Sequence, residues 1–108
     1  FPRPVLQLTI APGVRVADPA VAETVLRLAQ EALTNAARHA AADRVWLRID
    51  SEDQQLHIDI HDDGQCAPLL REGNGIAGMR ERLAALDGTL DVGRTARGGL
   101  HLHAQLPA

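Results

Sequence analysis

The chain has 108 residues, a formal net charge of −3, eleven arginines and no lysine. Its length suits one domain over residues 1–108, and its start at Phe1 suggests a fragment of a longer protein. The absence of lysine excludes sites that need an ammonium group, such as a P-loop or a Schiff base. Because the arginines are scattered and no apolar run approaches the length of a membrane span, we expect neither direct nucleic-acid binding nor membrane contact by this domain.

Apolar residues alternate in some segments and recur at three- and four-residue spacing in others, which predicts both strands and helices. The predicted elements are a strand over 5–10, a helix over 19–41, strands over 44–50 and 55–61, a helix over 76–87, and strands around 90–92 and 100–106. A polar, glycine-containing loop over 62–74 precedes the second helix. This order favours an α/β (α+β) two-layer sandwich, with a mixed, mostly antiparallel sheet covered by helices on one face.

The long helix carries four polar side chains beside its apolar stripe. At 100° per residue, Glu31, Asn35, Arg38 and His39 share one sector of the helix. A solvated helix flank with an ordinary ion pair is the alternative. Asn35 favours a functional site, because asparagine contributes little in the middle of a helix unless its amide has a partner.

A carboxylate at the end of the third predicted strand is the second candidate. Counting by two from the apolar residues of that strand places Asp62 on the core side, where an ionised carboxylate is costly without donors. Gly64 follows closely and lets another molecule approach the backbone. Asp62 is therefore either a receptor for an N–H group of a ligand or only the cap of an Asp-Gly turn.

Three glycines lead into the second helix and form the third candidate. Gly73, Gly75 and Gly78 permit close backbone approach, and the free amides at a helix start attract anions. The G-x-G-x-x-G spacing also matches the dinucleotide-binding fingerprint. That interpretation fails because a polar, proline-containing segment, and not an apolar strand, precedes Gly73.

The three motifs together, EALTNAARHA, DDG and GNGIAGMRERLAALDG, are far more specific than any one of them. Over residues 20–107 they resemble the GHKL (Bergerat) ATP-binding fold of histidine kinases, DNA gyrase, ninety-kilodalton heat-shock chaperones and mismatch-repair ATPases. Within that fold the chain is similar to the catalytic domain of bacterial sensor histidine kinases of the nitrate-sensor and DesK-like type.

The resemblance implies specific roles at the matching positions. Glu31 would be the catalytic residue that positions the reacting group, and Asn35 would hold Mg²⁺ that bridges the ATP phosphates. Asp62 would accept a hydrogen bond from the adenine amino group, with Gly64 making room for the base. The full set of implied nucleotide-binding residues is Asn35, Arg38, His39, Asp62, Gly64, Gly73, Gly75, Ile76, Gly78 and Met79.

The implied function is that of a histidine protein kinase. The domain would bind ATP with Mg²⁺ and donate the γ-phosphate to a histidine on a dimerisation domain absent from this chain, in two-component signal transduction. The expected partners are that phospho-acceptor domain and a response regulator with a helix-turn-helix output. The expected location is the cytoplasm, as part of a membrane-anchored sensor.

Two departures from the family pattern keep other functions open. Cys66 stands where the family pattern has a second glycine, two residues after Gly64, and Leu100 replaces a threonine near the adenine site. The alternatives are a degenerate, non-catalytic nucleotide- or partner-binding module, and an anti-sigma-type serine kinase or ATPase of the same fold.

Four histidines share the outward side of two predicted strands: His57, His61, His101 and His103. A metal site is conceivable if the strands are neighbours. The alternative is a polar sheet face that is solvated or covered by another domain.

Overall fold

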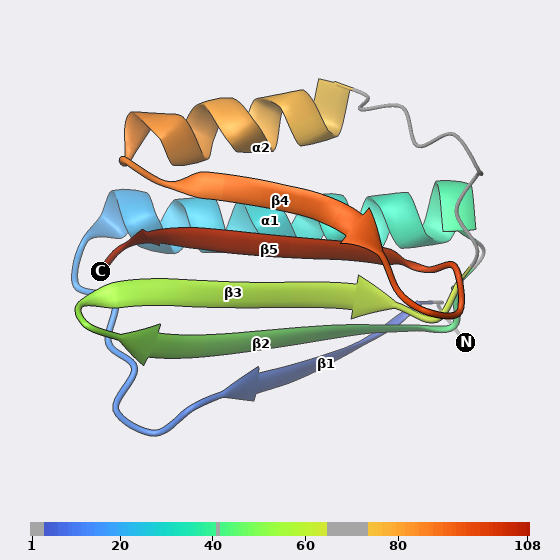
Figure 1. The fold of residues 1–108 in the computed structure, drawn as a ribbon, viewed down its shortest axis with the longest axis horizontal. Coiled ribbons are helices and arrows are strands. Elements are labelled where there is room, and N and C mark those ends of the chain that lie inside the picture. Colours follow the sequence, from blue (N-terminus) through green and yellow to red (C-terminus); the bar gives the residue numbers. More distant parts are fainter. Residues whose placement is uncertain (1–3, 41, 65–73) are drawn as a thin grey trace.

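The computed structural model describes residues 4–40, 42–64 and 74–108, which form one sheet with helices on one of its faces (Figure 1). The elements are β1 (Val5–Ile10), α1 (Pro19–Asn35), the π-helix η1 (Ala36–Ala40), β2 (Arg44–Glu52), β3 (Gln55–Asp62), α2 (Asn74–Ala85), β4 (Thr89–Arg94) and β5 (Leu100–Pro107). No helix among the residues that the structure describes is long and apolar enough to cross a membrane.

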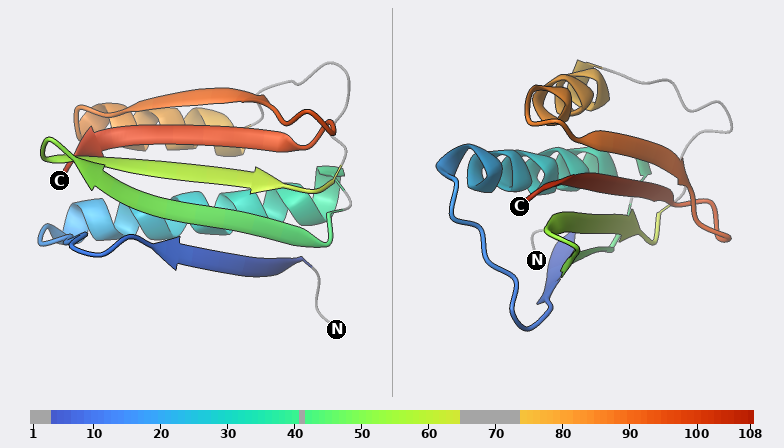
Figure 2. Two further views of the ribbon diagram at one scale, coloured as in Figure 1. Left: turned by 60° about the horizontal axis from the view of Figure 1, so that its bottom comes forward. Right: turned by 60° about the vertical axis from the view of Figure 1, so that its left-hand side comes forward.

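The sheet has five strands in the order β1-β2-β3-β5-β4. β1 runs parallel to β2, because α1 carries the chain back between them, and the other neighbouring pairs are antiparallel. Both helices pack against the same face, so the chain is a two-layer sandwich (Figure 2). The predicted fold class is therefore confirmed.

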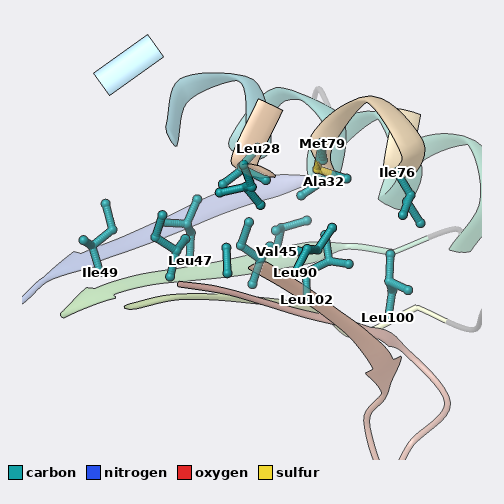
Figure 3. Packing of buried hydrophobic residues seen from close by; sticks show 14 of the residues in the cluster. Leu28, Ala32, Val45, Leu47, Ile49, Ile76, Met79, Leu90, Leu100 and Leu102 are labelled. Atoms are coloured by element: carbon teal, nitrogen blue, oxygen red, sulfur yellow. The ribbon is translucent and has the colours of Figure 1, made fainter. Parts of the chain in front are cut away.

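The core lies between this face and the two helices. Its members alternate along the strands and recur at helical spacing along α1 and α2, as the sequence pattern predicts. Figure 3 shows how they interdigitate. Side chains with less than 2% exposure include Leu28, Val45, Leu56, Ile58, Met79, Leu83, Leu102 and Leu106. This continuous core holds the ends of the strands and helices in fixed positions.

The first helix differs from its prediction near its C-terminal end. α-Helical geometry stops at Asn35, and residues Ala36–Ala40 form a π-helix. The spacing of apolar residues cannot distinguish the two, because small residues such as Ala36 stay buried in either. The 100° rule used to place Arg38 and His39 does not apply in a π-helix, whose hydrogen bonds join residues five apart.

β1 also differs from an ordinary half-buried strand. All six of its residues are exposed, and Leu8 and Ile10 keep 52% and 53% of their surface accessible. Both views in Figure 2 show β1 at the sheet edge beyond the cover of α1. The apolar residues of β1 therefore predict the strand correctly. They do not predict its exposure, because that depends on how far the helices extend over the sheet.

Candidate functional site

The segments that carry the three sequence motifs meet at one end of the sandwich. The C-terminal end of α1, the C-terminal end of β3 and the N-terminal end of α2 all lie there, beside the turn between β4 and β5 (Figure 1). Glu31 and Asn35 come from α1, Asp62 from β3 and Gly75 from α2. Residues far apart in sequence are therefore brought together by the fold.

Asp62 is a buried carboxylate with one oxygen engaged. Its exposure is 5%, and its Oδ1 accepts backbone hydrogen bonds from Gly64 at 3.0 Å and Leu100 at 3.4 Å. Burial raises the pKa of Asp62, and these two amides only partly oppose the rise. Among the described residues no donor bonds Oδ2, which leaves this oxygen able to accept a further hydrogen bond.

Gly99 lets the start of β5 approach this carboxylate. A Cβ at Gly99 would collide with the backbone oxygen of Asp62 and lie 2.9 Å from its Oδ1. Any larger residue would therefore push the start of β5 away and remove the Leu100 amide from the carboxylate. The sequence identified Asp62 from its strand position but gave no indication of this contact.

Glu31 lies against the beginning of α2. A Cβ at Gly75 would collide with Glu31 Oε2 and lie 3.0 Å from its Cδ, so the carboxylate packs on the bare backbone there. A helix N-terminus favours negative charge, which suits this placement. Asn35 is one helical turn beyond Glu31 and is also half-buried. A carboxylate and a carboxamide thus lie together on the side of α1 nearest the start of α2.

The other candidate positions have mixed outcomes. Arg38 lies in η1 and is exposed. The sector that it was expected to share with Glu31 and Asn35 assumes a continuous α-helix, so it does not apply to Arg38. The side chain of His39, and Gly73 as a whole, lie outside the described residues. Ile76 and Met79 are core residues with 5% and 1% exposure, which leaves only their backbone to meet a ligand.

Asp63 is a structural residue that the sequence interpretation missed. Its Oδ1 accepts hydrogen bonds from the backbone amides of Asp43 and Arg44, each at 2.9 Å, and these bonds hold its pKa below the ordinary value. The Arg44 amide is the largest cause. Side chains alternate along a strand, so Asp63 faces outward when Asp62 faces the core. This opposite direction is the feature of the sequence that could have indicated a separate role for Asp63. Asp63 fixes the end of β3 to the start of β2.

We expect Asp63→Ala to lower the free energy of unfolding by about 1–2 kcal/mol, because two backbone amides lose their acceptor. Urea denaturation measures the change. The matched control is Asp91→Ala, since Asp91 is an exposed strand aspartate whose side chain makes no hydrogen bond to another described residue. An equal loss in both variants would contradict the role given to Asp63.

The histidines form a separate cluster on the open face of the sheet. Asp59 Oδ1 lies 3.1 Å from His101 Nε2 and 2.9 Å from His103 Nδ1. Burial works against ionisation of Asp59, but hydrogen bonds to His103 and His101 hold its pKa below the ordinary value. His61 stacks on Trp46 with ring centroids 5.0 Å apart. β3 and β5 are neighbours, so the condition under which the sequence allows a metal site is met.

This cluster does not make a metal centre. Within residues 4–40, 42–64 and 74–108, no group of three His, Cys, Asp or Glu side chains is placed to hold a metal ion. The polar-face interpretation of the four histidines is the one that the described residues support.

A shallow hollow of about 250 Å³ lies between the two helices at the opposite end of the sandwich. It is lined by Ala20, Glu23, Thr24, Arg82, Ala85 and Leu86. These residues occupy the first half of α1 and the C-terminal end of α2, far along both helices from Glu31 and Gly75. The hollow is therefore separate from the site built around Asp62.

Comparison with known proteins agrees with this arrangement. Residues 20–108 match the family of histidine kinase-, DNA gyrase B- and HSP90-like ATPases. The chain is 39% identical over 89 residues to the sensor histidine kinase YxjM of Bacillus subtilis, covering 82% of this chain and 22% of YxjM. It is 40% identical over 86 residues to the histidine-protein kinase/phosphatase UhpB of Salmonella typhimurium, covering 78% of this chain and 17% of UhpB.

A solved structure shows the same fold. The histidine kinase domain of a blue-light activated kinase from Erythrobacter litoralis superposes with a TM-score of 0.75 and 24% identity, covering 97% of this chain and 52% of that one. The chain thus spans about a fifth of its curated relatives and about half of this domain structure. The chain belongs to the family of histidine kinase-, DNA gyrase B- and HSP90-like ATPases, in which it groups with the sensor histidine kinases.

Proposed function

We propose that this domain binds ATP with Mg²⁺ and presents the γ-phosphate to a histidine of a phospho-acceptor domain. The observation that carries the proposal is the buried Asp62, with Oδ1 held by two backbone amides and Oδ2 without a donor among the described residues. Family membership makes ATP the expected ligand.

The arrangement around Asp62 fits adenine. The exocyclic amino group of adenine is an N–H donor at the position where guanine has an oxygen, so a fixed carboxylate oxygen selects adenine. Gly64 and Gly99 carry no side chain that would narrow the space beside the carboxylate. In its ionised form the Asp62 carboxylate only accepts hydrogen bonds, as this contact with an N–H donor requires.

The other half of the site fits a magnesium–triphosphate group. Asn35 offers an amide oxygen, the type of ligand that Mg²⁺ prefers, and the start of α2 offers backbone amides to phosphate oxygens. When bound, the metal ion would neutralise charge on the phosphates. We assign Arg38, His39 and the glycines at 73, 75 and 78 to the phosphates, and Glu31 to positioning of the reacting group.

Phosphoryl transfer needs positioning and charge neutralisation more than covalent chemistry by the protein. The domain therefore supplies the nucleotide in a fixed orientation, and the acceptor histidine comes from a domain outside this chain. We propose that it works as one 1–108 domain within a longer, membrane-anchored kinase, on the cytoplasmic side. The acceptor would pass its phosphoryl group to a response regulator with a helix-turn-helix output.

A transfer assay tests the proposal. The domain is mixed with a purified phospho-acceptor histidine domain and γ-labelled ATP, with and without Mg²⁺. We expect label on the acceptor histidine that requires Mg²⁺ and falls by about 10²-fold or more in Glu31→Gln and Asn35→Ala. Glu52→Gln, at an exposed position in β2, is the control and should transfer like wild type.

A non-catalytic binding module is the second candidate, because Leu100 lacks the hydroxyl expected near the adenine site. Leu100 nevertheless reaches Asp62 through its backbone amide, which does not depend on the side chain. Binding of ATP without any transfer to the acceptor would favour the module. Labelling of serine in a partner protein would favour the anti-sigma-type kinase, and no binding at millimolar ATP would refute both the kinase and the nucleotide-binding module.

A further inference from the structure

The turn between β4 and β5 is closed by the side chain and backbone of Thr95. Its Oγ1 accepts a hydrogen bond from the Gly99 amide at 2.9 Å, and its own amide donates to the Gly99 oxygen at 2.8 Å. The Gly98 amide donates to the Thr95 oxygen at 3.0 Å, and Gly98 has the positive φ of 91° that suits glycine. Two hydrogen bonds thus join Gly99 directly to Thr95, and a third holds the neighbouring Gly98.

Gly99 is also the residue that touches Asp62. The Cα of Gly99 lies so close to the backbone and carboxylate of Asp62 that a Cβ on it would collide with them. The next amide, that of Leu100, is one of the two donors to Asp62 Oδ1. At 3.4 Å this bond is long, so a small shift of the turn would break it.

We propose that Thr95 is a positioning residue for Asp62 and, through it, for recognition of the adenine amino group. The inference rests on the proposed ATP binding. The Thr95 hydroxyl holds Gly99, Gly99 places the Leu100 amide, and that amide helps to hold Oδ1 so that Oδ2 faces the ligand. The side chain of Leu100 itself is in the core at 7% exposure and offers the site only its backbone.

The proposal predicts that loss of the Thr95 hydroxyl weakens binding only of nucleotides whose base carries the amino group. Thr95→Val keeps the shape of the side chain but removes the acceptor for Gly99. We expect ATP to bind about 3- to 10-fold more weakly, the range for one hydrogen bond. Purine riboside triphosphate, which lacks the 6-amino group, should bind Thr95→Val and wild type equally. Thr95→Ser keeps the hydroxyl and should restore ATP affinity.

Isothermal titration calorimetry with Mg²⁺ and each nucleotide measures these affinities. Thr89→Val, at an exposed position of β4, is the matched control and should not change them. In an Asp62→Asn background, Thr95→Val should cause no further loss of ATP affinity. If Thr95→Val does not fold, Thr95→Ala removes the same hydroxyl without a β-branched side chain.

Wild-type ATP affinity in Thr95→Val would overturn the positioning role alone, and so would an equal loss of affinity for ATP and the purine analogue. An undiminished effect of Thr95→Val in the Asp62→Asn background would do the same, because the residue would then act independently of Asp62. A wild-type domain that binds no ATP would instead refute the proposed function, and the inference with it.

Discussion

Replacing Asp62 by asparagine is expected to weaken ATP binding about 10- to 100-fold while leaving the fold intact, the range for a hydrogen bond to a charged group. Asparagine can still accept the Gly64 and Leu100 amides through its oxygen. Its amino group would then take the place of Oδ2 and present a donor to the adenine amino group. Two donors facing each other cannot bond. Calorimetric titration with ATP and Mg²⁺ measures the loss.

The same substitution should not reduce stability at a pH above the raised pKa of Asp62. Burial raises the pKa of Asp62 above its ordinary value of 3.8, so the folded state binds the proton more tightly than the unfolded state. The stability contributed by this group therefore falls as pH rises from 3.8 through the raised folded-state pKa. Above the raised pKa the ionised carboxylate is a cost that Asp62→Asn removes, so the free energy of unfolding of the variant should equal or exceed that of wild type there.

Denaturant unfolding over a range of pH separates the two effects. The advantage of Asp62→Asn should be greatest above the raised pKa and disappear below 3.8, where both side chains are neutral. Asp53→Asn is the control, because Asp53 is exposed in the β2–β3 turn with a φ of 52°, which asparagine accepts. A variant that unfolds at pH 7 would show that Asp62 is structural and would contradict its role as a ligand acceptor.

The position of Asp62 could be predicted because strands have a strict period of two. Once Leu56, Ile58 and Ile60 are assigned to the core, Asp62 must point the same way as long as the strand continues, and β3 does extend to it. The same rule placed the four histidines on the open face. The strands, the core residues and the two-layer architecture followed from patterns that each element carries within itself.

Features that depend on contacts between distant elements could not be predicted in this way. The exposure of Leu8 depends on how far α1 extends over the sheet, and the contact of Gly99 with Asp62 depends on the register of β3 and β5. The π-helix after Asn35 has no signal in apolar spacing. A Thr-x-x-Gly-Gly turn was visible in the sequence, but nothing local connected Thr95 to Asp62.

The contact between Glu31 and Gly75 leads to the second large effect. Gly75→Ala should reduce phosphoryl transfer to the acceptor about 10²-fold, because displacement of a positioning group by about 1 Å has effects of that size. The colliding atom is the far end of the Glu31 side chain, which can rotate away. The fold should therefore survive, and alanine is the better helix former by about 1 kcal/mol.

A double-mutant cycle shows whether the loss acts through Glu31. Gly75→Ala is added to the Glu31→Gln variant, which no longer has the carboxylate. If Gly75→Ala works by displacing that carboxylate, it should have little further effect on transfer in this variant. ATP affinity should change much less than transfer in both single variants, because Asp62, the proposed contact for adenine, is untouched. Thermal unfolding checks that each variant is folded at the assay temperature.

Gly93→Ala is the matched control for adding a methyl group, since a Cβ there meets nothing within 4 Å. It should transfer like wild type, although glycine-to-alanine changes alter the unfolded state in both cases. Additive losses for Gly75→Ala and Glu31→Gln would mean that the glycine acts through the nucleotide and not through the carboxylate. The backbone at Gly75 would then contact the phosphates directly. The close packing of Glu31 on α2 would follow only from the small size of glycine and would have no role in transfer.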